Sequence, residues 1–239
     1  VEPAGSRMIP LSLAYQSLAG APRQILERIN LTLETNRLRL VHMAGPDATF
    51  SWWGNTTENS ALWTAYAYYA DWYASRTLNI EIPREHWAHL LEAYRRNADK
   101  EPPLYRALAL WFAGEMGLPI KTMLDGLQDQ LEAGMKPGPY VRRTATSLLL
   151  AEPPSPLSQE IALVLVAQMA RQQQQGLKPR IAARVDTARA LLRKNGGALG
   201  QALLLLESGS KNTAQAEAIL AQVRQEMPTF DRALTLVWV

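Results

Sequence analysis

Apolar residues recur at intervals of three and four positions along almost the whole chain, and no segment alternates apolar and polar residues cleanly. The first spacing places apolar side chains along one face of an α-helix, whereas a half-buried β-strand needs the second. The sequence therefore predicts an all-α protein. Helices are expected near residues 10–18, 21–43, 57–76, 83–98, 102–116, 119–133, 138–150, 157–175, 179–194, 197–207, 212–226 and 229–238.

Prolines and glycines separate these periodic stretches. Proline suits the first turn of a helix, where its missing N–H has no partner to lose, and glycine suits the left-handed cap after the last turn. The prolines so placed are Pro83, Pro102, Pro119, Pro139 and Pro156. The glycines so placed are Gly117, Gly134, Gly176 and Gly196. Residues 55–58 offer capping side chains for the helix at 57–76, and residues 1–9, 44–56 and 151–156 are expected to be irregular.

Composition excludes several classes of protein. The 239 residues can bury a substantial core, and 47% hydrophobic with 20% charged residues is ordinary for a globular chain. The net charge is +3 and no run of Lys or Arg exceeds two, so no nucleic-acid partner is expected. No apolar stretch approaches the ~20 residues of a membrane span. The absence of cysteine removes disulfides, zinc–thiolate sites and cysteine nucleophiles.

Short connections between successive helices predict antiparallel pairs. Such pairs can close into an α/α toroid, a ring of helical hairpins, or stack into an open solenoid. A tetratricopeptide-type solenoid repeats about every 34 residues, and only residues 212–228 resemble such a unit. The lack of a repeat favours the closed toroid, formed by residues 1–239 as a single domain. The chain starts without methionine and ends in an apolar stretch, so it is interpreted as excised from a larger protein.

Residues 36–69 combine several features in a fixed order. A helix ends, a Gly-Pro-Asp turn follows, then Phe-Ser-Trp-Trp-Gly at 50–54, and then a helix carrying Thr-Ala-Tyr at 64–66. This order resembles the thioester domain of the bacterial α2-macroglobulins, which belong with the complement thioester proteins. The Ile82-Pro83 pair, opening the next helix, is similar to the same family. The close resemblance covers roughly residues 1–98.

The resemblance identifies where the reactive motif of the family, Pro-x-Gly-Cys-x-Glu-Gln, would stand. Residues 3–9 read Pro-Ala-Gly-Ser-Arg-Met-Ile, so Pro3 and Gly5 match. Ser6, Met8 and Ile9 occupy the positions of the cysteine, the glutamate and the glutamine. A thioester needs a thiolate and a glutamine acyl group. The resemblance therefore implies a vestigial site, of the branch of the family that lacks the thioester.

Family membership would imply more. The chain would be a non-catalytic structural and interaction domain, without a cofactor, of a large periplasmic protein resembling a protease trap, often anchored at the inner membrane. Its partners would be the neighbouring domains of the parent, target proteases reached through the parent, and a protein of the cell envelope. Two alternatives stay open: a helical-repeat scaffold that binds proteins, and an α/α-barrel enzyme acting on carbohydrate.

The aromatic residues have two interpretations. Burying a large side chain contributes about 1.5–3 kcal/mol, so core packing alone accounts for Trp52 and Trp53, and the aromatic helix that follows is expected to pack on several sides. The alternative is a contact surface formed by these two residues and Trp63, including a carbohydrate-binding groove.

Several other polar residues are candidates for a functional site. Ser6 as a nucleophile would need an oriented base, and the nearest histidine in sequence is His42. His86, His89 and Glu92 share one helical face but lack the spacing of a zinc-protease motif, so an exposed polar face is expected and no metal site. For a carbohydrate enzyme, Glu58 and Asp71 lie too far apart along one helix to form an acid–base pair.

Overall fold

The computed structural model describes residues 2–18, 20–45, 47–51, 60–134, 157–223 and 227–239. Within these ranges every regular element is a helix and no strand occurs, which confirms the prediction of an all-α chain. The contacts group the chain into two compact units, residues 1–118 and residues 119–239. No helix in the described ranges is long and apolar enough to cross a membrane.

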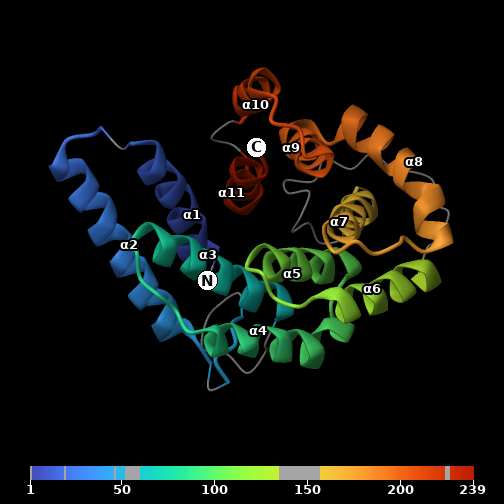
Figure 1. Cartoon of the computed structure of the whole chain (residues 1–239), viewed down its shortest axis with the longest axis horizontal. Helices are drawn as coiled ribbons and strands as arrows, with labels where there is room; N and C mark the ends of the chain where they lie inside the picture. Colours follow the sequence, from blue (N-terminus) through green and yellow to red (C-terminus); the bar gives the residue numbers. More distant parts are fainter. Residues whose placement is uncertain (1, 19, 46, 52–59, 135–156, 224–226) are drawn as a thin grey trace. The chain divides into compact units, whose positions relative to one another are not determined.

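The helices follow the predicted order (Figure 1). Unit 1 contains α1 (Glu2–Ser17), α2 (Arg23–Met43), α3 (Ala61–Thr77), α4 (Arg84–Asn97), a 3₁₀ turn η1 (Ala98–Lys100) and α5 (Pro103–Glu115). Unit 2 contains α6 (Lys121–Gly134), α7 (Ser158–Gln172), α8 (Pro179–Asn195), α9 (Gly197–Ser208), α10 (Thr213–Leu220) and α11 (Thr229–Trp238). The helix predicted at 138–150 lies outside the described residues.

Helix α3 is the centre of unit 1. It packs against α1, α2, α4 and α5 (Figure 1), and residues 61–70 are all buried. The prediction that this aromatic helix packs on several sides is confirmed. Its start differs from the predicted one: the helix begins at Ala61, because the Ser60 hydroxyl accepts a hydrogen bond from the Trp63 N–H and caps the first turn.

The Glu101 carboxylate supports the same helix start from a distant part of the chain. It accepts hydrogen bonds from the N–H groups of Ala61, at 2.7 Å, and Leu62, at 3.2 Å. The first N–H groups of a helix have no hydrogen-bond partner within the helix. The Glu101 carboxylate accepts hydrogen bonds from two of them. Burial raises the pKa of Glu101, and hydrogen bonds from Ser60, Ala61 and Leu62 act in the opposite direction.

The prediction of an irregular N-terminal segment is wrong. Residues 2–9 form the first half of α1, and Pro10 lies inside the helix. A proline there removes the hydrogen bond that its N–H would donate to the Ser6 carbonyl, and this normally favours a break. Met8, Ile9 and Ser12 are fully buried. Burial of this face against unit 1 therefore outweighs the cost of the proline.

The left-handed helix caps agree with the predictions only in part. Gly117, which follows α5, has φ +77°, as predicted. At the α8–α9 junction the left-handed residue is Gly197, with φ +56°, and not Gly196. Gly196 is needed for space instead, because a Cβ there would lie 2.6 Å from the carbonyl oxygen of Leu192. After α7 the left-handed residue is Gln174 in place of Gly176.

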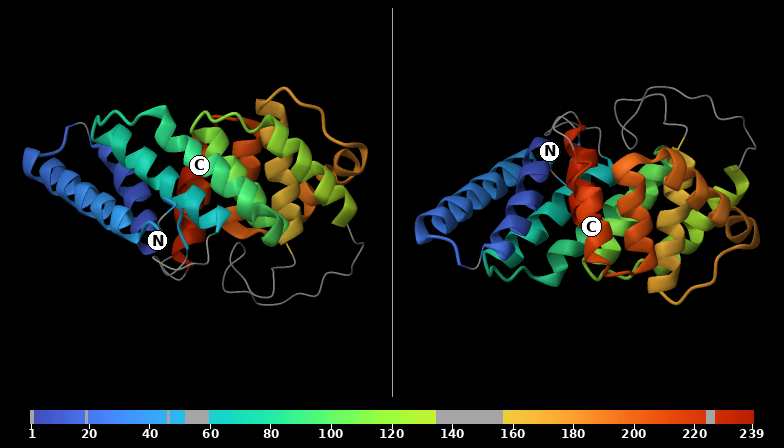
Figure 2. Two further views of the ribbon diagram at one scale, coloured as in Figure 1. Left: turned by 90° about the horizontal axis from the view of Figure 1, so that it is seen from below. Right: turned by 90° about the horizontal axis from the view of Figure 1, so that it is seen from above.

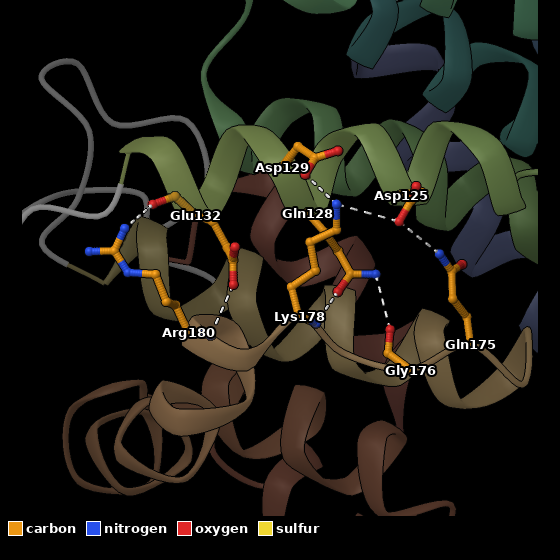
Figure 3. A network of polar contacts seen from close by, with 8 residues as sticks. All are labelled: Asp125, Gln128, Asp129, Glu132, Gln175, Gly176, Lys178 and Arg180. Atoms are coloured by element: carbon orange, nitrogen blue, oxygen red, sulfur yellow. Dashed lines mark hydrogen bonds and ion pairs between the residues drawn. The ribbon is translucent and has the colours of Figure 1, made fainter.

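Unit 2 is built around α7, which packs against α6, α8 and α9. The apolar run at residues 161–167 is buried throughout, as predicted for a core helix. A polar network joins α6 to the connection between α7 and α8 (Figure 3). The fully buried Gln128 accepts a hydrogen bond from the Lys178 N–H at 2.9 Å and donates one to the Gly176 carbonyl at 3.4 Å.

Charged groups extend this network on both sides of Gln128 (Figure 3). The Lys178 ammonium group pairs with the carboxylates of Asp125 and Asp129. Hydrogen bonding to Asp129 raises the pKa of Lys178. One turn further along α6, the Glu132 carboxylate accepts a hydrogen bond from the Arg180 N–H at 2.9 Å. Asp125, Asp129 and Glu132 lie on one face of α6, at spacings of four and three residues. This face therefore binds the connection between α7 and α8 along its length.

Candidate functional site

Ser6, which the resemblance aligns with the family's cysteine, lies in the contact between α1 and α3. Ser6 is buried, and its hydroxyl shares a hydrogen bond with the Tyr66 hydroxyl, the two oxygens being 2.7 Å apart. Tyr66 comes from the middle of α3 and is also fully buried. Sixty residues of chain separate the two partners. The hydroxyl of Ser6 is therefore engaged inside unit 1.

Gly5 brings the backbone of α1 close to the same ring. A Cβ at this position would lie 2.7 Å from Cε1 of Tyr66, closer than carbon atoms approach without contact strain. The ring has little room to yield, because it also packs against Phe112 with ring centroids 5.6 Å apart. A glycine is therefore required for the close approach of α1 to α3.

Apolar side chains occupy the other two positions of the motif. Met8 and Ile9, which the resemblance aligns with the family's glutamate and glutamine, are both 0% exposed. Neither side chain has an acyl group. The side chain of Pro3 lies outside the described residues.

This arrangement does not support nucleophilic catalysis at Ser6. An activated serine needs a base within hydrogen-bond reach that a third group orients. The hydrogen-bond partner described here is a phenol, which in its neutral form is no such base. The serine is 6% exposed. The geometry supports packing of α1 on α3.

Aromatic rings continue from Tyr66 into the core of unit 1. Tyr69 lies 4.8 Å from Phe112 and 5.6 Å from Trp111, measured between ring centroids. Burial raises the pKa of Tyr69 well above its ordinary value. Trp63 is 7% exposed and packs edge-on against Tyr66, so little of this ring is open to a partner. Trp52 and Trp53 lie outside the described residues.

The histidines of α4 lie on an exposed face, as predicted. His86 and His89 are exposed, and the carboxylate of Glu92 pairs with Arg95 and Arg96. Burial of part of the His86 ring, which packs edge-on against Tyr68, lowers the pKa of His86. In the part of the chain that the structure describes, no group of His, Cys, Asp and Glu is arranged to hold a metal ion.

Asp71, the carboxylate weighed for a carbohydrate enzyme, is held by an ion pair. Its Oδ1 lies 2.6 Å from Nε of Arg37 on α2, and both side chains are mostly buried. This pair ties α2 to α3. Its partner in that hypothesis, Glu58, lies outside the described residues.

Sequence reasoning located Ser6 but not its surroundings. The Ser6–Tyr66 pair, the Glu101 cap and the Gln128 network each join residues at least 39 positions apart in the chain. Periodicity reports only neighbours along one helix. Gly5 gave no such signal, because residues 1–9 were expected to be irregular and the close approach to Tyr66 appears only once they form a helix.

The chain is 42% identical to the Alpha-2-macroglobulin of Ralstonia nicotianae (strain ATCC BAA-1114 / GMI1000) over 246 aligned residues. The alignment covers the whole of this chain but 16% of the length of that protein. No family model matches the chain, and no solved structure matches it. The chain is therefore related, along its whole length, to one segment of a bacterial alpha-2-macroglobulin.

Proposed function

From this relationship, we propose that the chain is a thioester-domain-like α/α toroid, a single domain of a larger alpha-2-macroglobulin-like protease inhibitor. In this proposal the domain has lost the thioester and serves as a structural and interaction domain. The parent protein works in the periplasm, anchored at the inner membrane, and meets target proteases and a protein of the cell envelope. The relative supports the parent family, and the all-helical architecture agrees with a toroid.

The observation that carries the proposal is the state of the three motif positions. The Ser6 hydroxyl is bonded to Tyr66, and Met8 and Ile9 are fully buried apolar residues. A reactive acyl centre must be reachable by its target once the trap is triggered. The Ser6 bond to α3 and the burial of Met8 and Ile9 support a packing role for these positions.

Inhibition by such a protein would rest on enclosure of the protease. A caged protease still cleaves small peptides, which diffuse into the cage, but is shielded from large proteins. The domain would then form part of the cage wall. Trp52 and Trp53 are proposed as a contact surface for neighbouring domains.

The proposal is tested with the full-length parent protein and a protease. Cleavage of a large protein and of a small peptide is measured in parallel, and the mixture is then denatured to look for a protease linked covalently to the inhibitor. We expect loss of large-substrate cleavage, survival of peptide cleavage and no covalent adduct. Equal cleavage of both substrates would contradict trapping, and an adduct would contradict the loss of the covalent reaction.

A further inference from the structure

Asn195 and Gly196 form the only asparagine–glycine pair among the 239 residues of the sequence. An asparagine that precedes a glycine is prone to spontaneous loss of its side-chain amide. The backbone nitrogen of the glycine attacks Cγ of the asparagine, and a glycine has no side chain that would hinder this approach. The reactivity of the pair therefore depends on how the fold holds these two residues.

The reaction at such a pair has two steps, and water is the co-reactant. In the first step a bond forms between the Gly196 nitrogen and Cγ of Asn195, the bond from Cγ to Nδ2 breaks, and ammonia leaves with the proton of the Gly196 N–H. In the second step water adds to one of the two carbonyl carbons of the five-membered imide, and the ring opens. The product is an aspartate or an isoaspartate, whose backbone runs through the former side chain.

The end of α8 opposes the first step. Asn195 is the last residue of this helix, so its backbone is helical. The Gly196 N–H donates a hydrogen bond to the Leu192 carbonyl, with the nitrogen 2.8 Å from the oxygen. For the Gly196 nitrogen to reach Cγ of Asn195, the ψ angle of Asn195 must leave the helical range, and this rotation breaks the hydrogen bond. Attack requires close and aligned reacting atoms, so the folded geometry is the unreactive one.

The junction between α8 and α9 holds Gly196 tightly. Gly196 ends α8 and precedes α9, and its carbonyl accepts a hydrogen bond from the Gly200 N–H at 2.9 Å. It is buried, and a Cβ there would lie 2.6 Å from the Leu192 carbonyl oxygen and 2.8 Å from Cα of Gly200. The two helices, drawn in orange, are neighbours in both views of Figure 2. Rotation at Asn195 therefore requires this packed junction to open.

The surroundings of Asn195 favour the second step and make its result lasting. The residue is exposed, so water reaches the imide as soon as it forms. An isoaspartate adds an atom to the backbone directly before Gly196, a residue with no spare room on its side toward Leu192 and Gly200. The modification therefore hinders the junction from closing again.

We propose that Asn195 is a site of spontaneous amide loss and that the closed α8–α9 junction protects it. Each opening of the junction exposes the pair to reaction, so the modified fraction records how often unit 2 opens at this point. The chemistry needs only water and the residues of the junction, and it does not depend on the proposed function of the domain.

The test follows the full-length protein in mildly alkaline buffer, with and without urea that unfolds it. At intervals the protein is digested, and mass spectrometry measures the conversion of amide to acid at Asn195 and at the exposed Asn212. Gly197→Ala strains the junction, because Gly197 is left-handed with φ +56° and alanine disfavours this conformation. Gly209→Ala is the matched control, since it places the same strain, at φ +66°, after the other end of α9.

We expect Asn195 to react at least about tenfold faster in urea than in native buffer, and faster than Asn212 in both. Gly197→Ala should accelerate the native reaction at Asn195 about fivefold or more, and Gly209→Ala less than about twofold. Equal rates with and without urea would overturn the proposal, because the junction would then give no protection. It would also be overturned if Gly197→Ala accelerated the reaction no more than Gly209→Ala, or if Asn195 reacted more slowly than Asn212.

Discussion

The two units are each built around one buried helix, but these helices have different compositions. The buried part of α3 carries Tyr66, Tyr68 and Tyr69, whereas residues 161–167 of α7 are Ile, Ala, Leu, Val, Leu, Val and Ala. A buried tyrosine oxygen needs a partner, and Tyr66 bonds Ser6 while Tyr68 donates to the Ala48 carbonyl at 2.9 Å. Residues 161–167 of α7 are held by the close packing of aliphatic side chains. α3 is held by packing and also by hydrogen bonds of its tyrosine hydroxyl groups, which fix the positions of the neighbouring segments.

The two units also differ in how they hold their outer helices. Unit 1 holds α1 through contacts of defined geometry, at Gly5 and Ser6. Unit 2 has buried polar contacts at Gln128 on α6 and at Glu160 at the start of α7, outside the aliphatic run 161–167. In unit 2, the largest losses of unfolding free energy are therefore expected from substitutions that make a buried side chain smaller. Around α3, substitutions that disturb a close contact or a hydroxyl hydrogen bond should also lower the unfolding free energy.

The largest effect is expected for Leu165→Ala in α7. Leu165 is fully buried, and removing such a side chain leaves a cavity that costs about 2–5 kcal/mol of unfolding free energy. Urea unfolding followed by circular dichroism measures the loss. The exposed Leu220→Ala is the control and should change stability by less than about 0.5 kcal/mol. A loss of similar size in both variants would refute packing by volume in unit 2.

Gly5→Ala should cost about 1–3 kcal/mol, because the added methyl group meets the buried Tyr66 ring. Gly126 offers a matched control within α6, where a Cβ would meet nothing within 4 Å. Gly126→Ala should raise stability by about 0.5–1 kcal/mol, since alanine is the better helix former. The same denaturant titration compares the two. If both variants gained stability, the close approach of α1 and α3 would be wrong.

Gln128→Leu should cost about 1–3 kcal/mol, because the Gly176 carbonyl and the Lys178 N–H lose their buried partner. Amide hydrogen exchange of Lys178 should accelerate in the same variant. Gln24→Leu, at an exposed position of α2, is the control. An unchanged exchange rate at Lys178 would show that another group holds this connection.

Tyr66→Phe should cost about 1 kcal/mol through loss of the bond to Ser6. A double-mutant cycle with Ser6→Ala isolates the pair, and we expect a coupling of about 0.5–1.5 kcal/mol. Unfolding free energies of the four proteins give this value. If the losses of unfolding free energy in the two single variants simply add up in the double variant, the two hydroxyl groups do not stabilise each other.

The smallest effect is a pH dependence at Glu101. Burial raises the pKa of this carboxyl above its usual value, so the folded state binds the proton more tightly than the unfolded state. Its contribution to stability is therefore greatest at low pH and is lost as the pH rises through the folded pKa. The difference in unfolding free energy between the natural chain and Glu101→Gln should fall from about pH 4 to about pH 7. If this difference in unfolding free energy grew between these pH values, the raised pKa of Glu101 would be contradicted.

Much of the fold was predictable because local chemistry sets helix boundaries. The helix predicted at 102–116 is found at Pro103–Glu115, where Pro102 and Gly117 mark its ends. The prediction failed at α1, since Pro10 is locally unfavourable and the burial that compensates for it comes from α3. Ser6 was located by resemblance, but its partner Tyr66 was beyond reach, because nothing in the local pattern brings two positions sixty residues apart together.

The most direct test of the account is Ser6→Ala in the full-length parent, assayed for cleavage of a large protein and a small peptide by an added protease. Ser6 is expected to pack α1 on α3 and to perform no chemistry. The expected result is a ratio of large- to small-substrate cleavage within about twofold of the unmodified protein, together with a loss of about 1 kcal/mol of stability. Loss of protection of the large substrate in a variant that keeps its full stability would contradict the account.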